Sequence, residues 1–227
     1  MRTLRSASRE VNFSPRERRL IARLRTPLAV QQYLNRLPYN TEPPPGGATL
    51  RSFRGVVRHG SAHCLEAALF AAVVLEQHGY PPRVLSFESI DELDHVIFLY
   101  RSRGRWGSVA RSRDPGLHGR LPVFATPRAL ALSYADPYVD YSGRVTAYAV
   151  VDLAKEMGDY DWRLAGTNIW KVERMLLDHA HRPIKTSDRR FAQLRKWYRE
   201  YRASHGGRKP IDYAGRERWT PIPDEFL

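Results

Sequence analysis

The sequence predicts an α+β fold, in which an antiparallel sheet packs on a central cysteine-bearing helix and helical appendages lie at both ends. Three observations lead to this prediction. Residues 65–75 are almost wholly apolar and directly follow Cys64, the only cysteine in the chain. Segments with a period-two apolar pattern come next, joined by short polar connections. Helical patterns lie before and after this centre, and we expect them to cover it.

Three short helices are expected ahead of the cysteine helix. A hydroxyl side chain in capping position marks the start of each, at Ser14, Thr26 and Thr49. A proline follows the first two caps, as is typical of the first helical position. The second helix should run up to Pro38 and the third through Arg58 to Gly60. Between them, residues 38–47 are rich in proline and glycine, which predicts a linker or a wrapping loop.

The cysteine helix has signals at both of its ends. Ser61 is a good N-cap and Gly79 a good residue just past the C-terminus, so Cys64 should lie in the first helical turn. Because this helix is apolar nearly all round, we expect it to be covered on more than one side. The unpaired N–H groups and partial positive charge of a helix start favour a thiolate.

After Gly79 the apolar pattern changes from helix to sheet. Strands are expected at 83–88, 95–100, 106–110 and 145–151. The short polar connection 101–105 contains glycine and predicts a hairpin between the second and third strands. Residues 114–122 should form a rigid loop, and 127–134 a short helix.

The C-terminal part of the chain should be mainly helical. Helices are expected within 162–179 and over the strongly basic 187–204, followed by a tail that is extended or mobile. We expect one compact domain with three parts. Residues 1–48 form an N-terminal helical arm with a linker, 49–160 form the core, and 161–227 form a basic helical segment with a tail.

The formal net charge of +13 is unevenly distributed. Residues 1–58 hold 12 basic and 3 acidic residues and 180–227 hold 12 and 6, whereas 59–179 hold 13 and 15. Flanks of +9 and +6 thus surround a core of −2, and basic flanks can attract nucleic acid or acidic surfaces. Because aromatic residues are not interleaved with these charges as a stacking platform needs, nucleic acid is not the partner that we expect first.

The sequence also indicates a compartment. No apolar stretch reaches the ~20 residues that a membrane span needs, and residues 1–9 lack the apolar region of a secretory signal. A single cysteine allows no internal disulfide. We therefore expect a cytoplasmic protein with no membrane partner, and the oligomeric state stays open.

Cys64 and His95 are the first candidate site residues. A cysteine on a helix start and a histidine on a nearby strand form the nucleophile–base arrangement of thiol enzymes. The backbone N–H of Cys64 is an expected donor to an oxyanion. The structural alternatives are that Cys64 is a small apolar residue of a buried helix and that His95 is a half-buried strand residue.

His63 and His118 are interpreted as surface residues and not as ligands. A zinc site built from Cys64, His59 and His63 is not expected, because glycine and serine at 60 and 61 interrupt the helix that such spacing needs and no second cysteine exists. The sequence therefore predicts no metal and no cofactor.

The order of residues over 60–114 resembles the core of the transglutaminase-like superfamily, whose members share a papain-like arrangement. The motifs that carry the resemblance are Cys64, Leu75 to Gly79, Pro82-Arg83-Val84, His95, Trp106 and Asp114-Pro115. They cover about a quarter of the chain.

The resemblance implies a Cys-His-Asp triad with Cys64 as nucleophile, His95 as base and Asp114 as the group that orients the imidazole. Asp114 lies eight residues after Trp106, farther than the family usually places it, so Ser112 is the alternative third member. The implied chemistry proceeds through a thioester at an amide or peptide bond of a protein or peptide substrate, with hydrolysis expected ahead of acyl transfer to an amine. The opposing hypothesis is a catalytically degenerate fold that binds an acidic partner or nucleic acid through its basic flanks.

Overall fold

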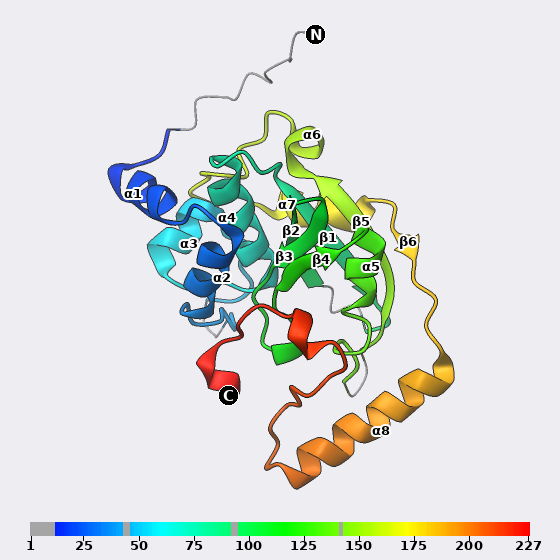
Figure 1. Ribbon diagram of the computed structural model, residues 1–227. Helices are drawn as coiled ribbons and strands as arrows, with labels where there is room; N and C mark the ends of the chain where they lie inside the picture. The colour runs from blue at the N-terminus through cyan, green and yellow to red at the C-terminus, as the bar shows by residue number, and fades with distance from the viewer. Residues whose placement is uncertain (1–11, 43–45, 92–94, 141–142) are drawn as a thin grey trace.

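The computed structural model describes residues 12–42, 46–91, 95–140 and 143–227. Within these residues a six-stranded antiparallel sheet runs in the order β4-β3-β2-β1-β5-β6 (Figure 1). Its strands are β1 (Arg83–Ser89), β2 (His95–Ser102), β3 (Arg105–Val109), β4 (Arg120–Phe124), β5 (Val145–Asp152) and β6 (Arg182–Pro183). The predicted α+β class with an antiparallel sheet is therefore confirmed. The proline run 43–45 of the predicted linker lies outside the described residues.

Helices lie on both faces and at the ends of this sheet (Figure 1). They are α1 (Pro15–Arg23), α2 (Pro27–Asn35), α3 (Phe53–His59), α4 (Cys64–Glu76), α5 (Pro127–Leu132), α6 (Leu153–Met157), α7 (Trp170–Asp178) and α8 (Asp188–Ser204). Short 3₁₀ turns occur at η1 (Pro115–Leu117), η2 (Arg216–Arg218) and η3 (Asp224–Phe226). None of the helices in the described ranges has the length and apolar character needed to cross a membrane.

The helix α4 forms the centre of the main core. It packs against β2 on one side and against α2 and α3 on others, and residues 65–75 are all buried. This confirms the expected cover on more than one side. The alternating side chains of β2 divide between two apolar clusters, with Val96 and Phe98 facing the α4 cluster and Ile97 facing the cluster that contains α5.

Two of the predicted helix caps are wrong. Ser52, not Thr49, caps α3, and His63, not Ser61, is the N-cap residue of α4. The hydroxyl groups of the two predicted caps form other hydrogen bonds. Thr49 donates to the Glu66 carboxylate at 3.0 Å, and Ser61 accepts from the guanidinium of Arg51 at 3.0 Å. The predicted ends at Gly60 and near Gly79 are confirmed, and both glycines have positive φ.

The strand β4 was predicted as part of a rigid loop. It contains Pro122, a residue that breaks most strands because it lacks an N–H group. β4 is the edge strand of the sheet and has β3 as its neighbouring strand, and at an edge the missing donor is tolerated. The helix α6 and the two-residue strand β6 were also not predicted.

The C-terminal tail packs against the body of the protein, where an extended or mobile segment was expected. Thr220 N–H donates to the carbonyl of Gly119 at 3.1 Å, and Trp219 forms a bridge with Arg120. In Figure 1, α8 extends along the outside of the molecule and the tail returns from its end to the sheet. Only Tyr198 of α8 is buried.

Candidate active site

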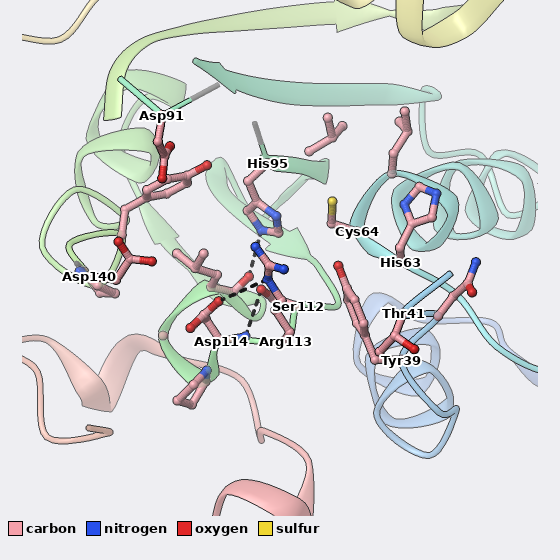
Figure 2. Close-up of a pocket in the computed structure, with 18 of the residues that line it drawn as sticks. Tyr39, Thr41, His63, Cys64, Asp91, His95, Ser112, Arg113, Asp114 and Asp140 are labelled. Atoms are coloured by element: carbon pink, nitrogen blue, oxygen red, sulfur yellow. Dashed lines mark hydrogen bonds and ion pairs between the residues drawn. The ribbon is translucent and has the colours of Figure 1, made fainter. Parts of the chain in front are cut away.

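A pocket of about 650 Å³ opens at the start of α4. Its walls come from the segment between α2 and α3, the starts of α4 and β2, the loop after β3, and the C-terminal tail. Figure 2 shows Cys64 in this pocket with His95 on one side, His63 on the other and the Tyr39 hydroxyl pointing toward it. The pocket thus brings the adjacent residues His63 and Cys64 together with Tyr39 and His95, which are distant from them in sequence.

Cys64 is the first residue of α4, as the sequence predicted to within the first turn. Burial raises the pKa of its thiol, but hydrogen bonds and charge from His63 and His95 lower it more, so the pKa lies well below its ordinary value. The start of a helix adds to this effect. The thiol therefore has the environment of a reactive cysteine, which a merely apolar core position would not provide.

His95 is the first residue of β2 and is only 3% exposed. Its Nε2 lies 2.9 Å from the carbonyl oxygen of Leu117. A carbonyl only accepts, so this hydrogen bond requires Nε2–H and leaves Nδ1 to interact with the thiol. The ring also stacks on Phe87, with 6.2 Å between ring centroids.

His63 is not a surface residue, contrary to the sequence interpretation. Its side chain is 16% exposed, and Nε2 lies 3.0 Å from the carbonyl of Thr49 and 3.6 Å from a carboxylate oxygen of Glu66. Burial lowers the pKa of His63, but the hydrogen bond and charge of Cys64 and the charge of Glu66 raise it to about 9. At neutral pH His63 is therefore a cation beside the sulfur.

Glu66 is a fully buried carboxylate that sequence reasoning missed. It accepts hydrogen bonds from the Asn40 amide, the Thr49 hydroxyl and the backbone N–H groups of Arg51 and His63, at 2.9 to 3.1 Å. One carboxylate thus ties the segment before α3 to the start of α4. A signal was present in the sequence, because Glu66 is the one charged residue in an otherwise apolar helical run.

Tyr39 is a second residue that the sequence did not indicate. Its hydroxyl points toward Cys64 in Figure 2, and burial together with the Cys64 charge raises the Tyr39 pKa. Its backbone forms a parallel bridge with Ala62, which places the ring beside the start of α4. The guanidinium of Arg111 lies 5.7 Å from the ring centroid.

Asp114 and Ser112 line the same pocket, but the hydrogen bonds and ion pairs of their side chains are made with residues other than His95. The Asp114 carboxylate accepts from Nζ of Lys209 and lies 3.9 Å from Nε of Arg113. The Ser112 hydroxyl accepts from the backbone N–H of Asp114 at 3.1 Å. Among the described residues, the hydrogen-bond partner of His95 Nε2 is the Leu117 carbonyl, which no side-chain motif could have indicated.

The remaining predicted residues have structural roles. Trp106 is half-buried and packs on the cluster of the α5 face. His118 is fully buried, not exposed as predicted, and its Nε2 lies 3.1 Å from the Ser112 carbonyl. Burial and the charge of Arg111 lower the pKa of His118 well below its usual value. The part of the chain that the structure describes contains no group of three or more histidine, cysteine or acidic side chains that could hold a metal ion.

Comparison with known proteins adds little to this geometry. No protein-family model matches the chain, and no curated protein does. Among solved structures, LapG of Legionella pneumophila is similar at 13% identity and a TM-score of 0.38, over 70% of this chain and 82% of LapG. Calcium-bound LapG of Legionella pneumophila is similar at 16% identity and a TM-score of 0.35, over 69% of this chain and 86% of that LapG chain. At these values the likeness carries no argument about activity.

Proposed function

We propose that the protein is a transglutaminase-like thiol hydrolase of amide or peptide bonds, with Cys64 as nucleophile and His95 as general base. The observation that carries this proposal is the position of the Cys64 thiol, which lies at a helix start between two imidazoles in an open pocket. A thiolate stabilised in this way is the reactive form of a cysteine nucleophile.

In the first half of the reaction, the Cys64 thiolate attacks the carbonyl carbon of the substrate. The negative charge that develops on the carbonyl oxygen is stabilised by the backbone N–H of Cys64 and by the Tyr39 hydroxyl, which points toward Cys64. The protonated His95 gives its proton to the leaving nitrogen as the C–N bond breaks. An amine leaves and a thioester on Cys64 remains.

In the second half, neutral His95 removes a proton from water, which attacks the thioester carbon. The C–S bond breaks, the acid product leaves, and the thiolate and the protonated imidazole are restored. The Leu117 carbonyl accepts from Nε2 throughout, so the nitrogen that exchanges the proton stays directed at the pocket. We assign the orienting role to this carbonyl, and place Asp114 and Ser112 in the pocket wall.

A substrate protein or peptide is the partner that this chemistry requires. Water as the acyl acceptor gives hydrolysis, whereas an amine would give transfer through the same thioester. Incubation of a thioester-forming peptide with and without a primary amine separates the two, because hydrolysis releases free acid at a rate that the amine does not change.

The test of this proposal is the pH dependence of Cys64 alkylation by iodoacetamide. The alkylation rate of an activated thiol reaches its midpoint at a pH well below the pKa of ~8.5 of a free thiol. Cys64→Ala is the matched control, since it removes the only cysteine and must abolish both labelling and turnover. A wild-type midpoint equal to that of a model thiol would overturn the proposal.

A second candidate function is binding of an acidic partner or nucleic acid through the basic flanks. It is favoured by α8, whose exposed positions include Arg189, Arg190, Lys196 and Arg199. Retention on heparin that decreases steeply with salt would support it, because each released counterion contributes to the slope. Retention that does not depend on salt, or none, would exclude it.

A further inference from the structure

Arg120 is a fully buried arginine at the start of β4. Within the described residues, all of its hydrogen bonds go to carbonyl or hydroxyl oxygens rather than to a carboxylate. The carbonyls of Gly116 and His118 lie closest, at 2.7 and 2.8 Å, and those of Gly119 and Ser133 follow at 3.4 and 3.3 Å. A buried cation without a paired anion is costly, so its position calls for a specific role.

Two aromatic rings hold the Arg120 guanidinium in place. Its carbon lies 3.9 Å from the centroid of Tyr134 and 4.7 Å from that of Trp219. Burial lowers the pKa of Arg120 to about 10, so the group is still a cation at neutral pH. A planar guanidinium held between two rings presents its donors in a fixed direction.

Three successive backbone carbonyl groups of one loop accept hydrogen bonds alternately from Arg120 and from His95. The carbonyls of Gly116 and His118 point to Arg120, and the carbonyl of Leu117 between them points to Nε2 of His95. Tyr134 adds a further hold, because its hydroxyl donates to the same His118 carbonyl at 2.9 Å. The loop residues on both sides of Leu117 are therefore fixed by Arg120 and Tyr134.

We propose, building on the thiol hydrolysis above, that Arg120 is a positioning residue for His95. It fixes the loop 116–119 so that the Leu117 carbonyl occupies the place beside Nε2 where a triad would have its carboxylate. A backbone carbonyl can turn away by rotation of its peptide, unlike a carboxylate with two equivalent oxygens. The guanidinium prevents this rotation by holding the carbonyls on either side.

The variant Arg120→Lys tests the inference because it keeps the charge and removes the several directed donors. Without a fixed Leu117 carbonyl, the imidazolium form of His95 loses its acceptor and forms a weaker pair with the thiolate. The midpoint of the Cys64 alkylation profile should then rise by about one pH unit. At a pH below the midpoint, the variant would have about a tenfold smaller thiolate fraction than the wild type. Neutral His95 should also lose its preference for the Nε2–H tautomer, measured by ¹⁵N NMR of the imidazole.

This pH profile reports on several groups at once. The titratable and charged side chains that face Cys64 and His95 or line the same pocket include Tyr39, His63, Asp114, His118 and Tyr134, together with Asp91, Arg113, Tyr138 and Asp140. Arg120→Lys leaves every one of them in place and leaves the net charge unchanged. A shift in the profile therefore reports the loop geometry rather than a lost charge.

Because Arg120 is fully buried, a second variant guards against misfolding. Tyr134→Phe keeps the ring under the guanidinium and removes only the hydroxyl that holds the His118 carbonyl, so it should shift the midpoint in the same direction by a smaller amount. Ser133→Ala is the matched control, since it removes a hydroxyl contact of Arg120 at 3.3 Å that does not involve the loop, and it should leave the profile unchanged.

The outcomes separate this inference from the proposed function. If wild-type Cys64 is activated but a folded Arg120→Lys, or Tyr134→Phe where the first variant does not fold, keeps the wild-type midpoint and the Nε2–H tautomer, the positioning role is overturned and the thiol mechanism stands. If wild-type Cys64 is not activated, the proposed function fails on its own.

Discussion

The two imidazoles beside Cys64 lie in opposite electrostatic settings. His63 has a carboxylate oxygen of Glu66 at 3.6 Å, and its pKa is raised to about 9. His95 has only a neutral carbonyl at Nε2, 2.9 Å away. An anion holds a proton on its neighbouring imidazole far more strongly than a neutral acceptor does. We propose a division of labour on this difference in partners, in which His63 is a constant cation for the thiolate and His95 is the general acid–base group.

The largest expected effect comes from removing the ring that exchanges the proton. His95→Gln should lower kcat by about 10²-fold or more, the usual contribution of a general acid–base group. Cys64 should still react with iodoacetamide below its ordinary pKa, because His63 is still present as a cation. Loss of the activated thiol together with kcat would contradict the division of labour.

His63→Gln is the matched opposite change. It should raise the midpoint of the alkylation profile by about one unit or more, the usual effect of removing a nearby opposite charge. Above that new midpoint the thiolate is fully formed again and His95 is untouched, so kcat should recover. A variant whose kcat stays low at every pH would show that His63 takes part in proton transfer.

The raised pKa of His63 also predicts a pH dependence of stability. A group whose pKa is higher in the folded than in the unfolded protein stabilises the fold fully below its unfolded value, here 6.5, and loses this contribution as the pH rises through about 9. The difference in free energy of unfolding between wild type and His63→Gln should therefore decrease over that window. Urea unfolding of both proteins at several pH values measures it.

The smallest effect is expected at Asp114. Its carboxylate binds Lys209 of the tail and is 21% exposed, and ion pairs that water reaches contribute about 1 kcal/mol or less. Asp114→Asn should therefore change KM by a few-fold at most and leave the alkylation midpoint in place, and Lys209→Met should behave in the same way. A large loss of kcat in Asp114→Asn alone would instead show that Asp114 is the third member of the triad. The Leu117 carbonyl would then not be the group that orients His95.

The candidate nucleophile and base were predictable because their signals are local. An apolar run that follows directly after Cys64 places this residue in the first turn of a helix, and a period-two pattern begins a strand at His95. Edge strand β4 escaped prediction because Pro122 is a breaker everywhere except at an edge, and which strand lies at the edge depends on the whole sheet. The division of the chain at 48 and 160 stays a prediction.

The partners of the two imidazoles were not predictable in the same way. His63 is held by Thr49 and Glu66, and Thr49 reaches it only because the segment before α3 folds against α4. Tyr39 lies beside Cys64 because its backbone forms a parallel bridge with Ala62. These contacts join segments by loop geometry, for which neither spacing nor periodicity provides a pattern.

The sequence by itself determined the α+β class, the helix that begins at Cys64 and the strand that begins at His95, because caps and apolar periodicity act between near neighbours. Only the tertiary structure decided what surrounds these two residues. A backbone carbonyl has the same chemistry at every position, so Leu117 becomes the partner of His95 only through the loop that Arg120 holds. Likewise, His63 became a buried cation because the fold placed Glu66 and the thiol beside it.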